Sequence, residues 1–347
     1  RTGRQVRATA NHPIYTPEGW VHLGDLETED RVAIPREIFY QPSGDMSEHE
    51  IVVLAYAISE GNLCHPSSFY VYTKSEEELQ DYCAHLRCFP NSTATIDRSK
   101  SAMSIYAKRK DVAQPNGAVS FIEKLGLRNE TATTKFVPEE LFRLPASQIE
   151  LFLGRLWTGD GGIDPEGGQI FYSTSSKQLA RDTQHLLLRL SLPSTIYEKA
   201  FKYRGGKRPG YVVRVASTSV DVFAQKIGPH LIGKRARDLA RIQSTSIGQG
   251  RMTQDIIPTS VLPTVRRAVR LASREKETSM KGFMRGIGMS PRLLNRDARK
   301  KGYARSTLAE LAMATQDDAL NQWAASDIYW DEVASIDPGP VEEVYDL

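Results

Sequence analysis

The fold is decided by two stretches, Ile51-Val-Val-Leu-Ala-Tyr-Ala-Ile-Ser-Glu-Gly61 and Ile149-Glu-Leu-Phe-Leu-Gly-Arg-Leu-Trp-Thr-Gly-Asp-Gly161. Each is an apolar run of helical length that ends at an acidic residue followed by glycine. The small residues late in the two runs, Ser59 and Gly159, would let two helix backbones approach each other closely. We therefore predict two matching helices that pack against each other near their acidic ends.

The two stretches belong to an internal repeat, because a shift of the chain by 100 residues sets Glu60 on Asp160 and aligns a series of identical residues. The identical pairs are Gly61 with Gly161, Tyr72 with Tyr172, Ser75 with Ser175, Leu79 with Leu179, His85 with His185, Leu86 with Leu186, and Ile96 with Ile196. Chance gives a few matches at any one offset, but not this ordered series. The chain therefore contains a duplicated unit.

Both halves predict the same order of elements: an apolar helix, a strand, an amphipathic helix, a hairpin and a short closing helix. The strands are expected at 69–73 and 169–174, and the hairpin turns at 98–101 and 204–210. The amphipathic helices should begin at Ser75, with Glu78 completing a capping box, and at Ser175 or Ser176. The short helices are expected near 119–125 and 220–227. This pattern indicates an α+β fold with pseudo-two-fold symmetry.

The two matched acids suggest a site for divalent cations. Close approach of the two helices would bring Glu60 and Asp160 together, and two carboxylates repel unless divalent cations lie between them. Such an arrangement is required for two-metal phosphodiester hydrolysis. The alternative is that each acid merely ends an exposed helix, but a matched pair favours the metal site.

The hairpins carry basic residues that suit duplex DNA. A β-ribbon fits the major groove, where Arg and Lys contact guanine edges or phosphates. The alternative is that these hairpins are solvated loops. The candidate DNA-binding residues are Arg98, Lys100, Lys108 and Arg109 in the first half, and Lys199, Lys202, Arg204, Lys207, Arg208 and Arg214 in the second.

The two decisive stretches resemble the paired helices of a monomeric LAGLIDADG homing endonuclease of the DOD type. The segment Lys135-Phe-Val-Pro138 resembles the endonuclease block that carries a catalytic lysine. The resemblance implies Mg²⁺-dependent cleavage of both strands of double-stranded DNA, with Glu60 and Asp160 as metal-binding acids and Lys135 as the lysine. Glu60 stands where aspartate is usual, and Arg155 stands where a small residue often lies in the second helix.

The flanks resemble an intein. The segment Gly3-Arg-Gln-Val-Arg-Ala-Thr-Ala-Asn-His12 resembles splicing block B, and the segments 329–336 and 344–347 resemble block F, closest to inteins of actinobacterial replicative DNA helicases. By this resemblance His12 donates a proton in the initial acyl shift, Thr9 holds the strained peptide, and Asp346 helps to activate the nucleophiles. No splice-junction Cys or Ser begins the chain and no His-Asn pair ends it, so an incomplete, mostly β Hint domain that does not splice is expected.

Charge is distributed very unevenly. Residues 251–305 hold 14 Lys and Arg against 4 Asp and Glu, whereas residues 306–347 hold 10 Asp and Glu and no Lys or Arg. A basic block of this kind is either a solvated face or a phosphate-binding surface. The segment 280–295 has helix-turn-helix character and could contact DNA, or it could be a packing subdomain. The region 306–325 is expected to form an acidic amphipathic helix.

These features predict five parts: 1–42 and 327–347 from the splicing domain, 43–145 and 146–249 as the two LAGLIDADG halves, and 250–326 as a basic helical insert. Three cysteines without a disulfide framework and no apolar run of membrane-spanning length favour a cytoplasmic protein. We expect a monomer without a small-molecule cofactor, joined covalently to host exteins in the full gene product. A non-cleaving regulator or decayed endonuclease is the alternative, and the absence of a Gly-x-x-x-x-Gly-Lys-Ser/Thr loop excludes helicase activity from this chain, even if its host is a replicative helicase.

Overall fold

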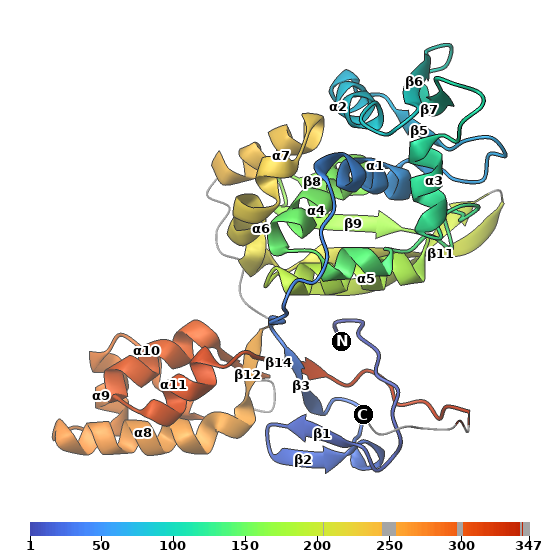
Figure 1. Cartoon of the computed structure of the whole chain (residues 1–347). Helices are drawn as coiled ribbons and strands as arrows, with labels where there is room; N and C mark the ends of the chain where they lie inside the picture. The colour runs from blue at the N-terminus through green and yellow to red at the C-terminus, as the bar shows by residue number, and fades with distance from the viewer. Residues whose placement is uncertain (204, 245–254, 297–300, 341, 343–347) are drawn as a thin grey trace. The chain divides into compact units, whose positions relative to one another are not determined.

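The computed structural model describes residues 1–203, 205–244, 255–296, 301–340 and 342 of the chain. It divides into two compact units, residues 37–250 and residues 1–36 with 251–347 (Figure 1). Within the described part, no helix is both long enough and apolar enough to span a bilayer. The five-part division predicted from the sequence is finer than these two units and stays a prediction.

The unit formed by residues 37–250 contains the repeat. Its first half comprises α1 (Glu48–Ser59), β4 (Gly61–Asn62), β5 (Tyr70–Thr73), α2 (Glu76–Leu86), β6 (Ser92–Asp97), β7 (Met103–Arg109) and α3 (Gly117–Lys124). Its second half comprises α4 (Ala146–Asp160), β8 (Gly161–Asp164), β9 (Gln169–Thr174), α5 (Lys177–Arg189), β10 (Ser194–Tyr203), β11 (Gly206–Val215), α6 (Val220–Lys226) and α7 (Gly233–Ser244). The antiparallel sheets have the equivalent orders β4-β5-β7-β6 and β8-β9-β11-β10, so the two halves share one topology.

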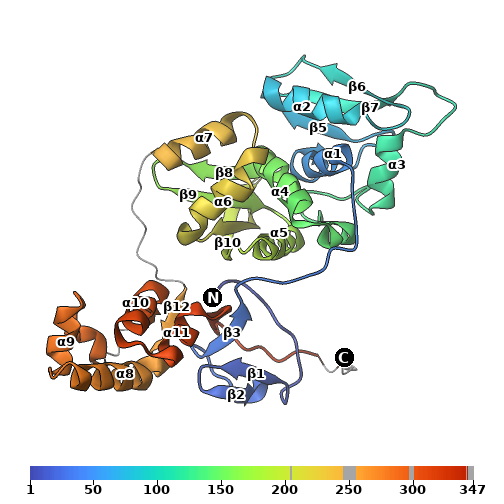
Figure 2. The same ribbon diagram turned by 60° about the vertical axis from the view of Figure 1, so that its left-hand side comes forward.

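Helices α1 and α4 lie side by side at the centre of this unit (Figure 2). A capping box fixes the start of α1, because the Ser47 side chain and the Glu50 carboxylate each accept from the other residue's backbone N–H. Helix α1 is buried on all sides, with every residue from Ile51 to Ile58 buried. A helix that is apolar all round belongs in a core. These two helices therefore form the shared core of the duplicated unit.

The predicted serine caps are present, with one correction. The Ser75 hydroxyl accepts from the Glu78 backbone N–H, and Ser176 caps α5 in the same way. The predicted capping box at Ser75 is wrong, because the Glu78 carboxylate instead accepts a hydrogen bond from the Thr73 hydroxyl at 2.5 Å. That interaction ties the second helix of the first half to the end of β5.

The sequence pairing of Tyr72 with Tyr172 does not hold in three dimensions. Gly61 pairs with Val71 in the first sheet, whereas Gly161 pairs with Tyr172 in the second. Tyr172 is fully buried, whereas Tyr72 is 38% exposed. A one-residue change of register moves a side chain to the opposite face of a sheet. The duplication therefore keeps the topology while the register slips by one residue in this strand.

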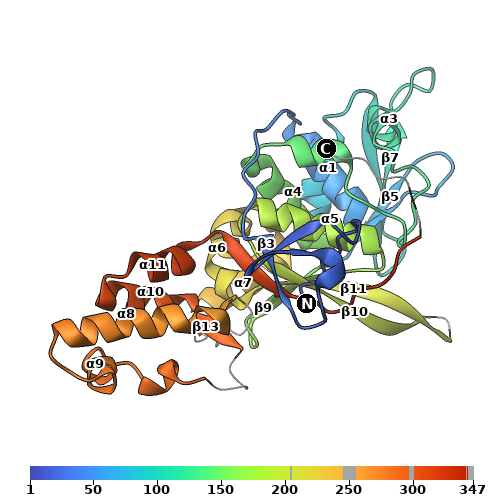
Figure 3. The same ribbon diagram turned by 90° about the horizontal axis from the view of Figure 1, so that it is seen from below.

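The second hairpin is longer than predicted. Strands β10 and β11 pair from Ser194 with Val215 to Tyr203 with Gly206. The predicted turn at 204–210 is therefore wrong for residues 206–210, which belong to β11. The hairpin forms a long two-stranded ribbon (Figure 3). The predicted turn of the first hairpin, 98–101, lies between β6 and β7 as expected.

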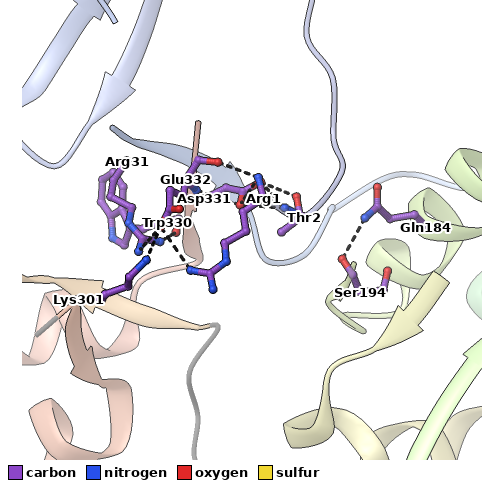
Figure 4. A network of polar contacts seen from close by, with 9 residues as sticks. All are labelled: Arg1, Thr2, Arg31, Gln184, Ser194, Lys301, Trp330, Asp331 and Glu332. Atoms are coloured by element: carbon purple, nitrogen blue, oxygen red, sulfur yellow. Dashed lines mark hydrogen bonds and ion pairs between the residues drawn. The ribbon is translucent and has the colours of Figure 1, made fainter. Parts of the chain in front are cut away.

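The other unit joins the two ends of the chain. Strand β3 (Arg31–Pro35) pairs antiparallel with β14 (Ile328–Glu332), and β1 (Pro13–Thr16) pairs with β2 (Gly19–His22). Next to this ribbon, Asp331 accepts hydrogen bonds from the Thr2 backbone N–H at 3.1 Å and from the Thr2 hydroxyl at 2.5 Å (Figure 4). The segments predicted to flank the endonuclease thus meet in one sheet.

A helical module completes this unit. It comprises β12 (Ile256–Pro258), α8 (Leu262–Glu275), α9 (Met280–Gly286), β13 (Gly302–Ala304), α10 (Arg305–Thr315) and α11 (Asp318–Ala325). Its core includes Trp330 of β14, so the helices pack on the ribbon. The buried Arg305 guanidinium reinforces this packing, because it donates to the Asp255 carboxylate and to the carbonyl oxygen of Ala324.

Two expectations for the helical module are wrong. The segment 280–295 is not a helix-turn-helix, because α9 is followed only by a four-residue 3₁₀ turn from Pro291 to Leu294. The acidic region 306–325 is two helices rather than one. Gln316 adopts a left-handed conformation with φ 53°, and the Asp317 side chain caps α11. A left-handed residue ends a helix, and an aspartate cap starts the next.

Gly159 provides a test of the helix packing. A Cβ on Gly159 would lie 2.4 Å from Ser59 Oγ and 2.7 Å from Ser59 Cβ. We expect Gly159→Ala to destabilise the fold by about 1–3 kcal/mol, because a packed core resists insertion of a methyl group. Gly286→Ala is the matched control, since a Cβ on this α9 glycine meets nothing within 4 Å. Equal thermal midpoints for the two variants would contradict the close crossing.

Candidate active site

The site lies where α1 and α4 end. Glu60 is the residue that follows α1, and Asp160 is the last residue of α4. A Cβ on Gly159 would lie 3.1 Å from Glu60 Cγ, so the Glu60 side chain lies against the end of the opposite helix. The structure therefore brings together the two acids that the repeat pairs.

The two acids have perturbed proton affinities. The pKa of Glu60 is raised from 4.5 to about 7, first by burial and then by the negative charge of Asp160. The pKa of Asp160 is raised from 3.8 to about 6 by burial. Burial and a neighbouring like charge both disfavour the ionised form of a carboxyl group. Bringing a cation to this position would relieve both effects.

Lys135 lies beside the acids and is only 5% exposed. Its ammonium donates to the carbonyl oxygens of Ile58 and Gly61, both at 2.7 Å. The Ile58 carbonyl lies in the last turn of α1, where helical carbonyls have no intrahelical partner and a cation is favoured, and Gly61 begins β4 directly after it. Burial lowers the pKa of Lys135 to about 8, although Asp160 and Glu60 act in the opposite direction. Lys135 therefore fixes the backbone around Glu60.

Arg235 on α7 is a second basic residue near the acids, and it was not identified from the sequence. Its charge lowers the pKa values of both Glu60 and Asp160. Its Nε is buried, with no hydrogen-bond partner among the described residues. The repeat contained the signal, because a shift of 100 residues places Lys135 on Arg235. Each half thus contributes one acid and one base to the site.

Arg155 packs without disrupting the helix pair. Its Nε donates to the Asp81 carboxylate at 2.8 Å, and its guanidinium also donates to the His230 carbonyl. The Tyr56 hydroxyl donates to the same Asp81 carboxylate at 3.0 Å. Burial and the Asp81 charge raise the pKa of Tyr56. This buried network connects α4 of the second half to α1 and α2 of the first.

In the second half, the predicted DNA-binding residues divide between the two faces of the β10–β11 ribbon. The register places Arg214 opposite Thr195, Lys199 opposite Gly210, and Arg208 opposite Phe201. Since partners share a face, Lys199, Arg208 and Arg214 lie on the face opposite the buried Val213. The Arg214 guanidinium carbon lies 5.3 Å from the Tyr197 ring centroid on that face. Lys202 and Lys207 pair with each other on the other face near the tip, and Arg204 lies outside the described residues.

In the first half, only one predicted DNA-binding residue lies on the equivalent face. Lys108 alternates with the buried Ile105 and Ala107 and so points away from the helices. Arg98 instead forms an ion pair with Glu76 at 2.9 Å, and Arg109 donates to the Val112 carbonyl at 3.1 Å. Lys100 lies in the turn between β6 and β7.

On the face of the first sheet that points away from the helices, three tyrosines lie where the second sheet carries basic residues. These tyrosines could not be identified from the sequence pattern. The Tyr70 ring centroid lies 5.1 Å from that of Tyr106 and 6.4 Å from that of Tyr72. All three residues lie on the face opposite Val71 and Ile105, which are buried. The outward faces of the two sheets therefore differ: the first carries tyrosines with Lys108, whereas the second carries three basic residues among aromatic ones.

Of the three predicted splicing residues, the structure describes Thr9 and His12. His12 donates its backbone N–H to the Thr9 carbonyl at 3.0 Å, which closes a turn directly before β1. Both side chains are exposed. Asp346 lies outside the described residues. The structure thus shows the local turn of the Thr-x-x-His segment.

The acids suit a divalent cation held jointly with a ligand. Within the described ranges, no cluster of three or more His, Cys, Asp and Glu side chains could hold a metal ion. Mg²⁺ commonly binds through one or two carboxylates together with substrate phosphates. Glu60 and Asp160 supply the two carboxylates, so the remaining oxygen ligands would come from a bound phosphate and water.

The raised pKa values predict how stability depends on pH without divalent metal. The unfolded chain releases the Glu60 proton near its ordinary pKa of 4.5, whereas the folded protein keeps it until about pH 7. The free energy of unfolding should therefore fall as pH rises from about 4.5 to about 7, since one pKa unit is worth about 1.4 kcal/mol. Glu60→Gln should flatten this decline in pH-dependent thermal melts. The exposed Glu139→Gln should keep the wild-type decline. Parallel curves for wild type and Glu60→Gln would show that Glu60 is not perturbed.

Part of the chain matches a known protein family. Residues 147–228 match the family of LAGLIDADG-like domains. The whole chain is 31% identical to part of the replicative DNA helicase DnaB of Rhodothermus marinus and 30% identical to part of DnaB of Nostoc sp.. The chain spans only 37% and 40% of the length of these two curated relatives.

Solved structures of homing endonucleases also align with the chain. Mesophilic variants of I-DmoI align with 14% identity and a TM-score of 0.36, over 52% of this chain and 94% of theirs. I-WcaI bound to its DNA recognition sequence aligns with 10% identity and a TM-score of 0.39, over 57% of this chain and 88% of its own.

Proposed function

We propose that this protein is a site-specific DNA endonuclease that uses Mg²⁺ to hydrolyse phosphodiester bonds in both strands. The observation that carries the proposal is the meeting of Glu60 and Asp160 at the ends of two packed helices. The match of residues 147–228 to LAGLIDADG-like domains supports it, because that segment contains α4 and Asp160. The family match thus supports the half of the site that contains Asp160, and the pairing with Glu60 rests on the helix contact.

Each residue of the site has a defined task in this proposal. Glu60 and Asp160 hold divalent cations, which when bound would neutralise charge on the attacking and leaving oxygens of a phosphodiester. Lys135 keeps the end of α1 in place and so orients Glu60. Arg235 offers a guanidinium beside the acids, and guanidinium groups bind phosphate oxygens through paired hydrogen bonds. Buried groups fixed in advance stabilise charge that develops during reaction.

The two open sheet faces would hold the duplex. Lys199, Arg208 and Arg214 supply positive charge for phosphates and donors for guanine edges. Tyr70 and Tyr106 supply flat apolar surface of the kind that contacts thymine methyl groups. The proposal therefore assigns different chemical surfaces to the two halves of the DNA site.

We further propose that the endonuclease is part of an intein in a replicative helicase. The match to a fraction of each DnaB relative supports this, because an intervening element occupies only part of its host protein. In this proposal Thr9, His12 and Asp346 serve the splicing steps. The meeting of β3 and β14 supports it as well, since a split splicing domain needs both flanks in one sheet. The actinobacterial attribution stays a prediction.

Cleavage assays test the endonuclease directly. We expect the protein with Mg²⁺ to cut a duplex that carries the intein-free host sequence. Glu60→Gln and Asp160→Asn should each abolish cutting while the dissociation constant for the duplex changes little. Glu139→Gln, which changes an exposed carboxylate that pairs with Arg143, should cut normally. Wild-type protein that binds this duplex but leaves it intact with Mg²⁺ or Mn²⁺ would instead be a regulator or a decayed endonuclease.

Arg235 and Lys135 should have separable effects. Arg235→Met should slow single-turnover cleavage by about 100-fold or more, as loss of a preorganised donor does elsewhere. Its thermal midpoint should change less than that of Lys135→Met, which leaves the buried carbonyls of Ile58 and Gly61 without their donor. Arg235→Lys should recover part of the rate. If Arg235→Met cleaves DNA at the wild-type rate, Arg235 takes no part in the reaction.

A further inference from the structure

Helix α8 has two chemically distinct faces. One face packs into the core of the helical module through Leu262, Val265, Ala268, Val269 and Ala272. The opposite face is exposed and carries Arg267, Arg270 and Arg274. These three positions follow helical spacing, so the arginines form one stripe along the surface. The stripe lies on a helix that is anchored by α9, α10 and α11 (Figure 3).

The arginines are spaced so that they repel one another. Arg270 has Arg266 four residues before it and Arg274 four residues after it. Arg267 lies three residues before Arg270. Like charges at these separations are neighbours on the helix surface and destabilise it. The only acidic residue of α8 is Glu275, its last residue. The array therefore weakens the isolated helix.

Internal partners account for two of these arginines. Arg266 donates to the Leu294 carbonyl at 2.8 Å, and Arg267 pairs with Asp317 at 3.2 Å. Arg270 and Arg274 form no ion pair with any described residue. Helix α9 adds exposed Lys281 and Arg285 one turn apart, and it has no acidic residue. Among the described residues, the exposed basic residues of α8 and α9 thus outnumber the acidic residues that pair with them.

We propose that the α8 stripe, defined as Arg267, Arg270 and Arg274, is a second DNA-binding surface that holds the phosphate backbone of duplex DNA independently of base sequence. Seven residues of helix rise about 10 Å. Along one strand of a duplex, phosphates recur about every 3.4 Å of axis, so the stripe spans about three of them. A polyanion would relieve the repulsion that the module leaves in place.

The structure of α8 argues against a membrane as the partner, and the proposed function favours DNA over RNA. A helix that binds membranes inserts an apolar face, but the apolar face of α8 is buried in the core, and Leu271 is the exposed apolar residue of the helix. The choice of duplex DNA over RNA rests on the proposed endonuclease function. The stripe itself does not depend on cleavage, because it lies in the unit formed by residues 1–36 and 251–347.

The test uses the whole chain and the double variant Arg270→Gln/Arg274→Gln, in which glutamine keeps the helix propensity. The affinity for a long duplex of unrelated sequence is measured from about 50 to about 200 mM salt. Each phosphate contact contributes about 0.9 to the slope of log affinity against log salt, so the variant should lose about 1.8. The thermal midpoint should stay the same or rise, because repulsion is removed.

A matched control removes the same charge elsewhere. Arg87→Gln/Lys124→Gln changes two exposed residues at the ends of α2 and α3, on the helical side of the first half. This variant should keep the wild-type salt slope. An unchanged slope for Arg270→Gln/Arg274→Gln, or a fall in its thermal midpoint of several degrees, would overturn the proposal and leave the stripe a structural feature.

Cleavage separates this inference from the proposed function. If the wild type cuts DNA, Arg270→Gln/Arg274→Gln should cut at the wild-type rate once protein is saturating. If the wild type does not cut, the loss of salt slope still supports the stripe. Binding to duplex RNA or to anionic vesicles that exceeds binding to duplex DNA, and that is lost in the same variant, would overturn the choice of DNA.

Discussion

The close crossing of two helices is the constraint on which the unit formed by residues 37–250 depends. Contact between the ends of α1 and α4 leaves no room for a Cβ at Gly159 and brings Glu60 and Asp160 together at the helix ends. Burial raises both pKa values, and the charge of Asp160 raises that of Glu60 further, so the fold bears an electrostatic cost at this point. The cost is understandable if cations bind there. Proteins commonly concentrate perturbed carboxylates where chemistry occurs.

Much of this arrangement could be predicted from the sequence. The repeat offset alone identified Glu60 and Asp160 as partners, because an acid before glycine recurs at the end of a matching apolar run. Arg235 was overlooked although the same offset pairs it with Lys135. Lys135 lies in a segment that resembles a family motif, whereas Arg235 lies in α7, which resembles none. A match at the repeat offset can therefore identify site residues that no family motif marks.

Register and helix breaks could not be predicted in the same way. Tyr72 and Tyr172 are identical at the repeat offset, yet a single-residue slip places them on opposite faces. Register depends on the hydrophobic pattern of both paired strands and on the geometry of the turn that joins them, and identity at one repeat offset does not report either. The division of residues 306–325 into two helices depends on the left-handed Gln316, a conformation that glutamine rarely adopts. Local sequence propensity therefore predicts which helices and strands form, but not the residues at which they begin and end.

Locating bound metal tests the central claim most directly. Crystals of the protein with duplex DNA would be soaked in Mn²⁺, and anomalous scattering would give the ion positions. The account predicts anomalous peaks within about 2–2.5 Å of carboxylate oxygens from both Glu60 and Asp160. Mn²⁺ bound only elsewhere at saturating concentration, or bound to one of the two carboxylates with the other turned away, would contradict the account.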